Sequence, residues 1–172
     1  KVEEIRDRAS RVSLRELSAR CADLPEPRGF ADALHARIAQ GRAAVIAEVT
    51  AAKLLGRGGA AFPTGRKWDA VAGESARPHY VVCNADESEP GTFKDRVLME
   101  QDPFAVIEAM TICGLATGAE RGFIYIRGEF TDPWQVMEKA VAEAYAAGAA
   151  GADAFGSGKR IELQRFRGAG RY

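Results

Sequence analysis

Residues 122–148 of this 172-residue chain read GFIYIRGEFTDPWQVMEKAVAEAYAAG, and this stretch decides the fold. It opens with an apolar run, residues 122–126, that is typical of a buried strand. Helix signals follow: Asp132 suits an N-cap, Pro133 the first helical position and Gly148 the end of the helix. The residues at helical spacing on the apolar face are Trp134, Met137, Val141, Ala144 and Tyr145. The stretch predicts a strand followed by a helix.

The same alternation extends in both directions along the chain. Residues 80–83 (YVVC) form an apolar run that predicts another buried strand. Pro103 begins a predicted helix over residues 104–117, which ends near Gly118. Residues 161–166 (IELQRF) alternate between apolar and polar side chains and predict a third strand. Strands that alternate with helices join into a parallel sheet, so we expect an α/β fold with flanking helices.

The beginning of the chain is rich in arginine and alanine and carries no recognisable chemistry. Ser13, followed by Glu16, has the spacing of a capping box at the start of a short helix. A second helix is expected over residues 30–39. We predict an N-terminal helical extension, residues 1–42, before an α/β domain, residues 43–172.

Composition limits the classes of function. Hydrophobic residues make up 47% of the chain and charged residues 28%, as in a globular protein. Lys and Arg number 24, and so do Asp and Glu, so no net charge favours nucleic acid or an anionic membrane. No apolar run approaches the ~18 residues of a membrane span. The three cysteines are widely spaced and the start of the chain is too charged for a secretory signal, so we expect a cytoplasmic location.

A glycine-rich segment, residues 55–68 (LGRGGAAFPTGRKW), is the first candidate binding element. Closely spaced glycines let backbone N–H groups approach a phosphate, Arg57 and Lys67 supply cations, and Phe62 can stack on an aromatic ligand. The segment lacks the ending of a P-loop. A helical pattern over residues 43–53 precedes it, whereas a dinucleotide fingerprint follows a strand. A phosphate loop and a plain connecting turn both stay open.

An acidic turn, residues 83–92 (CNADESEPGT), follows the first predicted strand. Ligands of open α/β sheets bind outside the carboxyl ends of the strands, where this turn falls. Asn84 and Asp86 can pair with the polar edges of a ligand, with Glu89 at the entrance of the site. A solvated loop with helix caps is the alternative. A divalent metal is disfavoured, because no second carboxylate cluster completes its ligands.

Together the two segments resemble one known family. Residues 56–68 and residues 83–96 (CNADESEPGTFKDR) closely resemble the flavin-bearing, NADH-oxidising subunit of complex I-type NADH dehydrogenases. The same module occurs in NAD-reducing hydrogenases and in NAD-dependent formate dehydrogenases. Further matches to the family pattern are residues 125–129, 156–158 and 167–170. The resemblance covers residues 43–172.

The resemblance implies a Rossmann-like domain that binds FMN non-covalently and holds NADH against it for hydride transfer to the flavin. It implies that Glu89 contacts the nicotinamide end of NADH and is the catalytic residue, while Phe62 stacks on the adenine. The residues implied in FMN binding are Gly56, Arg57, Gly58, Lys67, Asn84, Asp86, Glu87, Ser88 and Tyr172. No metal ligand is implied among these residues.

The chain departs from the family pattern at four positions. Ala61 replaces a glycine of the loop, which reduces the close approach of the backbone there. Leu55 stands where arginine is common. Ala70 stands where an aromatic residue is often found, so the adenine clamp is expected to be one-sided. Arg171 replaces a small residue.

Family members continue into an Ile-Cys-Gly-Glu-Glu motif, a ubiquitin-like domain and a helical domain that binds a [4Fe–4S] cluster. The resemblance therefore implies a longer parent that oxidises NADH and feeds iron–sulfur partner subunits, on the inner face of the membrane without insertion into it. For the isolated chain, the alternative is an inactive structural fragment. A dehydrogenase without flavin is less favoured, because His35 and His79 are expected to be structural.

Overall fold

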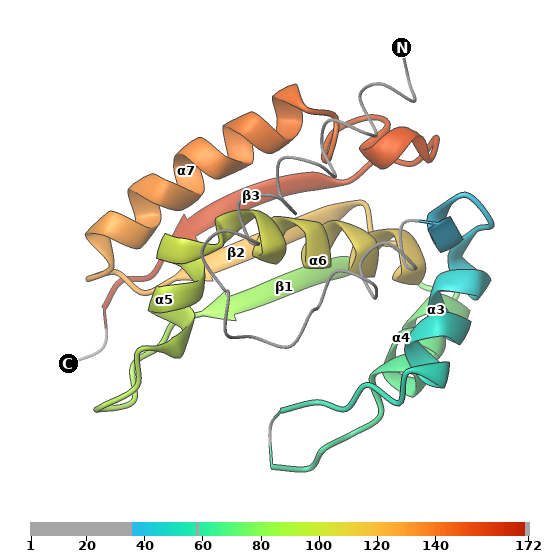
Figure 1. The fold of residues 1–172 in the computed structure, drawn as a ribbon, viewed down its shortest axis with the longest axis horizontal. Coiled ribbons are helices and arrows are strands. Elements are labelled where there is room, and N and C mark those ends of the chain that lie inside the picture. The colour runs from blue at the N-terminus through green and yellow to red at the C-terminus, as the bar shows by residue number, and fades with distance from the viewer. Residues whose placement is uncertain (1–35, 58, 171–172) are drawn as a thin grey trace.

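The computed structural model describes residues 36–57 and 59–170 (Figure 1). The helices are Arg42–Ala51 (α3), Thr64–Gly73 (α4), Lys94–Gln101 (α5), Pro103–Thr117 (α6) and Thr131–Ala146 (α7), with a 3-10 turn, η1, at Ala154–Gly156. The strands are Tyr80–Ala85 (β1), Arg121–Ile126 (β2) and Glu162–Arg167 (β3). No helix in this described part is long and apolar enough to cross a membrane.

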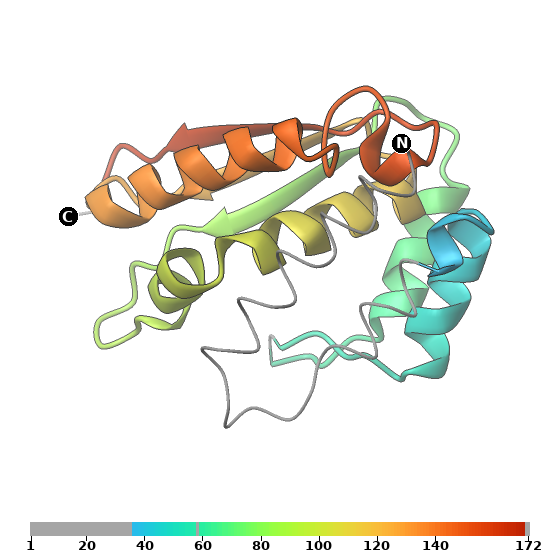
Figure 2. The same cartoon turned by 45° about the horizontal axis from the view of Figure 1, so that its top comes forward.

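The strands form one parallel sheet in the order β1-β2-β3, which confirms the predicted α/β alternation. Tyr80 lies opposite Arg121, and Arg121 lies opposite Glu162, so the strands are in step from their first residues. Because the strand order repeats the chain order, crossovers of one hand place their helices on the same face of the sheet. Figure 2 shows α5, α6 and α7 on that face.

The helix-covered face of the sheet holds the main core. Its buried side chains come from the strands and from α5, α6 and α7, and they include Ala85, Met99, Ile107, Met110, Ile124, Ile126, Met137, Val141 and Leu163. α6 is apolar around its whole circumference, because its other side packs against α3 and α4. That second cluster includes Val45, Val49, Ala72 and Ile112.

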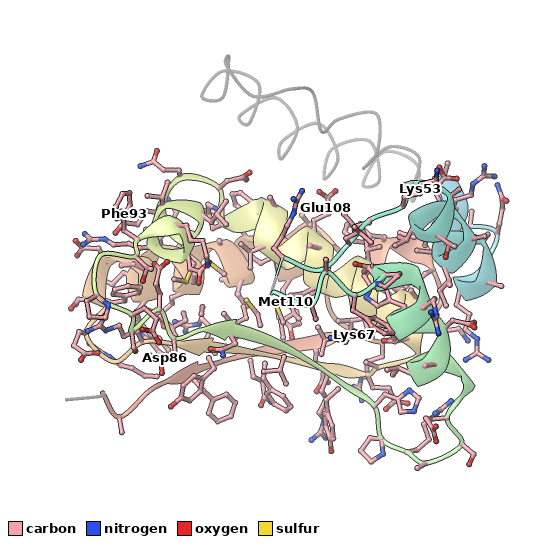
Figure 3. The ribbon with its side chains drawn as sticks, turned by 90° about the horizontal axis from the view of Figure 1, so that it is seen from below. Lys53, Lys67, Asp86, Phe93, Glu108 and Met110 are labelled. Carbon is pink, nitrogen blue, oxygen red and sulfur yellow. The ribbon has the colours of Figure 1, made fainter. Side chains whose placement is uncertain are left out.

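The other face of the sheet carries no helix of the described residues (Figure 3). Tyr80, Val82, Tyr125 and Phe166 are between 39% and 63% exposed. Successive side chains of a strand point to opposite faces, so each strand is buried on one side only. The prediction of fully buried strands over residues 80–83 and 122–126 is therefore wrong for one face. The physical cause is the sequential strand order, which sends both crossovers to the same side.

α6 begins and ends as the sequence predicts. The side chain of Asp102 accepts the N–H of Ala105, and Pro103 opens the helix. Gly118 follows its last residue in the left-handed conformation, at φ 74°. Between these bounds the helix packs against β1 and β2. The local signals at its two ends therefore fix the length of the helix that covers the sheet.

α7 corrects one sequence prediction. It begins at Thr131 after Phe130, so the prediction of Asp132 as the N-cap is wrong, and Asp132 lies in the first turn. Proline is tolerated throughout a first turn, where N–H groups have no helical partner, so Pro133 does not fix the first residue. The predicted end is confirmed, since the helix stops at Ala146 and Gly148 follows with φ 74°.

Two helices were not predicted from the sequence. α4 begins at Thr64, inside the glycine-rich segment, and α5 begins at Lys94, directly after the acidic turn. The helix predicted over residues 43–53 is confirmed as α3, although it ends earlier, at Ala51. Both additions place candidate site residues on or beside helices rather than in loops.

Only the end of the N-terminal segment is described. Residues 36–38 are helical, and Gly41, at φ 95°, separates them from α3. The helix predicted at Ser13 and most of the helix predicted over residues 30–39 lie outside the described residues. The division of the chain at residue 42 stays a prediction.

His79 is buried beside α6, with Nδ1 2.8 Å from the carbonyl oxygen of Thr117. This bond ties the start of β1 to the end of α6. The position fits the structural role that the sequence predicts for His79.

Candidate functional site at the carboxyl ends of the strands

Three loops meet at one edge of the sheet, because the parallel strands end in register. They are the acidic turn after β1, residues 127–130 after β2, and residues 168–170 after β3. Backbone hydrogen bonds join them: Arg127 N–H donates to the oxygen of Ala85 at 3.2 Å, and Gly168 N–H donates to the oxygen of Ile126 at 2.8 Å. This edge is where the sequence predicts a ligand.

The polar side chains of the acidic turn form a chain of hydrogen bonds. The N–H of Asp86 donates to Asn84 Oδ1 at 3.1 Å, and Ser88 Oγ donates to Asp86 Oδ1 at 2.8 Å. Asn84 is exposed, and the other two are half-buried. Within the described residues, the amide nitrogen of Asn84 and the second carboxylate oxygen of Asp86 carry no hydrogen bond. Both groups are therefore able to bind the polar edge of a ligand.

Glu87 is placed differently from its neighbours. Its side chain is 3% exposed, and its carboxylate accepts the backbone N–H groups of Asp95 and Arg96 at 3.1 Å. Lys94 Nζ lies 4.0 Å from Glu87 Oε1. A carboxylate is favourable at the positive end of a helix, and these N–H groups belong to the first turn of α5. The carboxylate of Glu87 is therefore engaged by α5.

Arg127 links the acidic turn to the loop after β2. Its Nη1 donates to the backbone oxygen of Glu87 at 2.8 Å, and its Nε donates to Glu129 Oε2 at 3.1 Å. The hydrogen bond from Arg127 is the main cause that lowers the pKa of the Glu129 carboxyl. The guanidinium carbon also lies 5.6 Å from the ring centre of Phe130. The sequence prediction assigned Arg127 no role, although it directly follows a strand.

Gly128 allows the loops after β2 and β3 to approach closely. A Cβ at this position would lie 2.5 Å from the oxygen of Gly168 and 3.0 Å from the nitrogen of Gly170, and both are backbone atoms. Arg167 Nε donates to the oxygen of Gly128 at 2.9 Å. A side chain at Gly128 would therefore push the two loops apart.

Glu89, the predicted catalytic residue, lies in the acidic turn and is exposed. Its backbone oxygen accepts Thr92 Oγ1 at 2.6 Å and the N–H of Thr92 at 3.1 Å, which closes the turn. Its carboxylate makes no hydrogen bond or ion pair within the described residues, so it is free to meet a ligand.

The glycine-rich segment forms an exposed hairpin between α3 and α4. The N–H of Gly56 donates to the oxygen of Phe62, and the N–H of Thr64 donates to the oxygen of Leu54, both at 2.9 Å. Figures 1 and 2 show its tip extending towards the side of the carboxyl ends of the strands. Because the Gly56 N–H is used within the hairpin, the N–H groups that can meet a phosphate lie nearer the tip, beyond Arg57.

Two residues at the base of the hairpin bear on the predicted binding roles. Ala61 has φ 45°, in the left-handed region that favours glycine, and it is the position at which the family pattern has glycine. The ring of Phe62 is 48% exposed, with the guanidinium carbon of Arg66 5.6 Å from its centre. Gly58 and Tyr172 lie outside the described residues.

Lys67 lies on α4 and is exposed. Burial raises the pKa of the Cys113 thiol on α6 to about 11, against an opposing effect of the Lys67 charge, so Lys67 lies near α6. In Figure 3, Asp86 stands at the carboxyl end of β1, and Lys67 is displaced towards the amino end. The structure thus brings together Asn84, Asp86 and Ser88, while no hydrogen bond or ion pair in the described part of the chain joins Lys67 or the hairpin to them.

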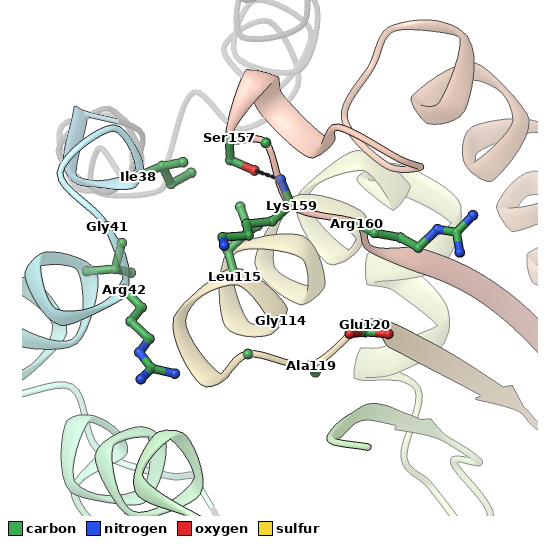
Figure 4. Close-up of a pocket in the computed structure, with 13 residues that line it drawn as sticks. Ile38, Gly41, Arg42, Gly114, Leu115, Ala119, Glu120, Ser157, Lys159 and Arg160 are labelled. Atoms are coloured by element: carbon green, nitrogen blue, oxygen red, sulfur yellow. Dashed lines mark hydrogen bonds between the residues drawn. The ribbon is translucent and has the colours of Figure 1, made fainter. Parts of the chain in front are cut away.

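A cavity of about 480 Å³ lies at the opposite, amino end of the sheet (Figure 4). Three cations line it, but they point in different directions: Arg42 towards Gly118, Arg160 towards Glu162, and Lys159 between them. They do not converge on one point, so we assign no ligand to this cavity.

Comparisons with known proteins agree with the sequence motifs. The family described as the Nuo51 FMN-binding domain matches residues 49–172. The chain is 47% identical over 128 residues to an F-type subunit, F 2, of the NADH-quinone oxidoreductase of Rhizobium meliloti (strain 1021), across 74% of this chain and 30% of that protein. It is 45% identical over 137 residues to the mitochondrial NADH dehydrogenase (ubiquinone) flavoprotein 1 of Dictyostelium discoideum, across 78% of this chain and 29% of that protein.

A solved structure is also similar. It is an NAD+-reducing [NiFe]-hydrogenase in the air-oxidized state, with a TM-score of 0.68 and 32% identity, across 90% of this chain and 24% of that chain. The chain spans less than a third of the length of these three proteins.

Proposed function

Because the chain belongs to the Nuo51 FMN-binding domain family, we propose that it is the FMN- and NADH-binding part of a flavoprotein subunit that oxidises NADH. The observation that carries this proposal is the group of polar side chains after β1, at the edge where open α/β sheets bind ligands. Asn84 and Asp86 each keep a polar group free there, and Glu89 keeps a free carboxylate.

The residues present fit an FMN molecule chemically. The isoalloxazine ring has a polar edge of donors and acceptors, which suits an amide beside a carboxylate. The phosphate requires backbone N–H groups and cations, and the hairpin offers the exposed Gly59 and Arg57. We assign the ring edge to Asn84, Asp86 and Ser88, and the phosphate to the hairpin, with Lys67 on the neighbouring helix.

When bound, FMN supplies an acceptor for the hydride of NADH and a means of passing electrons onward. The chain's own residues bind and orient the two molecules. Asn84 and Asp86 fix the ring edge, Glu89 holds the nicotinamide end of NADH, and Phe62 stacks on the adenine. No described carboxylate other than Glu89 in the acidic turn is free of the hydrogen bonds that hold the turn together.

The relatives are named as subunits of larger assemblies, which supports a similar setting for this chain. We propose that it works in a multisubunit NADH dehydrogenase or NAD-reducing hydrogenase, on the cytoplasmic side. Electrons would pass to iron–sulfur partner subunits, with a [4Fe–4S] cluster held by the part of the relatives that this chain does not span.

The test is an FMN titration of the purified chain, followed by quenching of flavin fluorescence. We expect quenching by the chain and bleaching of the bound flavin when NADH is added without oxygen. Asp86→Asn should weaken FMN binding, whereas Asp69→Asn, which removes the same charge from an exposed position on α4, should not. Failure of FMN to bind, or equal effects of the two substitutions, contradicts the proposal.

A further inference from the structure

We propose that Glu87 is a positioning residue that ties the acidic turn to α5, and that its carboxylate does not touch the cofactor. Phe93, at the N-cap position of α5, has no side-chain acceptor for the first N–H groups of the helix. An N-cap side chain normally accepts the N–H of the second or third helical residue. In α5 these residues are Asp95 and Arg96, and Glu87 accepts both N–H groups. Glu87 therefore caps α5 from the other end of the turn.

The same residue is fixed through its backbone. Arg127 donates to the oxygen of Glu87 at 2.8 Å, while the carboxylate is held by α5. Glu87 is thus anchored to the loop after β2 on one side and to α5 on the other. Asp86 and Ser88 flank it in the chain and are hydrogen-bonded to each other. The two anchors hold this pair in one geometry at the end of β1.

This inference rests on the proposed function only for its consequence for FMN. If Asp86 and Ser88 bind the flavin, loss of the tie should weaken binding although Glu87 makes no contact itself. The tie can also be tested without a ligand, because the N–H of Asp86 donates to Asn84 and reports the conformation of the turn.

Amide hydrogen exchange of four variants separates the tie from simple helix capping. Glu87→Ala should speed exchange at Asp95, Arg96 and Asp86 and weaken FMN binding, each by about tenfold, as expected for the loss of a cap. Adding Phe93→Ser supplies a local acceptor at the N-cap, so exchange at Asp95 and Arg96 should recover. Exchange at Asp86 and FMN binding should not recover, because the new hydroxyl does not hold the turn.

Glu87→Gln keeps the shape and should give the same pattern at smaller amplitude, should Glu87→Ala not fold. Glu100→Ala is the matched control, because it removes a carboxylate from the far end of α5 and should change neither readout. The proposal is overturned if Glu87→Ala leaves exchange at Asp95 and Arg96 unchanged, or if Phe93→Ser restores Asp86 as well. Absence of FMN binding by the wild-type chain counts against the proposed function, and the exchange results still decide the role of Glu87.

Discussion

At the scale of single residues, Gly128 is the position where the site tolerates least change. Its missing Cβ leaves room for backbone atoms of Gly168 and Gly170, which cannot move as a side chain can. We expect Gly128→Ala to lower the free energy of unfolding by about 1–3 kcal/mol, as overpacking does, and to weaken FMN binding. Gly73→Ala is the control, because a Cβ there meets nothing within 4 Å. Urea unfolding measures both, and equal effects would refute this account.

Ala61 gives the opposite prediction. An alanine at φ 45° is strained, and a glycine is not, so Ala61→Gly should stabilise the closed hairpin by about 1 kcal/mol. The measurement is slower amide exchange at Gly56 and Thr64, whose N–H groups close the hairpin. Ala60→Gly, at a neighbouring residue without a positive φ, should not slow exchange and serves as the control. Faster exchange in Ala61→Gly would contradict the strain.

The sequence could predict those site residues whose role depends on their place after a strand. Asn84 and Asp86 belong to this group, since the carboxyl end of β1 carries them whatever the surrounding loops do. The roles of Glu87 and Arg127 depend on a contact between two loops that are distant in the chain. No local pattern reports such a contact, which is why the sequence prediction gave Glu87 the same role as its neighbours.

At the scale of elements, the cap of α6 carries a pH dependence. Burial is the main cause that raises the pKa of Asp102 above its ordinary value of 3.8. A carboxyl whose pKa is raised on folding stabilises the fold below the unfolded pKa, and this contribution is lost as the pH rises through the folded pKa. Asp102→Asn keeps a capping oxygen without a charge. We therefore expect the wild-type chain to lose stability relative to Asp102→Asn as the pH rises above 3.8.

Urea unfolding of both chains at a series of pH values measures this difference. A difference in unfolding free energy that stays constant with pH, or that changes in favour of the wild-type chain, would show that burial of Asp102 does not raise its pKa.

Local signals also explain which helices were predicted. α6 has Asp102 before it, Pro103 at its start and Gly118 at its end, so its bounds can be read from the sequence. α5 lacks any such start signal, because its cap is provided by Glu87 from before the turn. A helix whose cap comes from another segment is invisible to a pattern that looks only at adjacent residues.

At the scale of the whole molecule, the sheet is covered on one face, and no helix of the described residues covers the other. Parallel sheets usually have both faces covered, and their strands then read as continuous apolar runs. The predicted buried strands followed that rule. The open face instead carries a row of aromatic rings, with Phe123 5.6 Å from Tyr80 and 5.5 Å from Phe166 between ring centres. These contacts reduce the apolar surface that meets water but do not remove it.

The two faces should therefore respond differently to the same kind of change. Val82 is 63% exposed, whereas Ile124, on the neighbouring strand, is fully buried. We expect Val82→Thr to change the free energy of unfolding by less than about 0.5 kcal/mol, because it leaves the core intact. Ile124→Thr should cost about 3 kcal/mol, because it creates a cavity and buries a hydroxyl.

A dye that fluoresces on apolar surfaces should bind the wild-type chain, and Val82→Thr combined with Phe166→Thr should reduce that signal. If Val82→Thr instead costs as much as Ile124→Thr, this face is covered in solution. The dependence of that cost on protein concentration would then tell whether a second copy of the chain covers it, because stability gained by association rises with concentration.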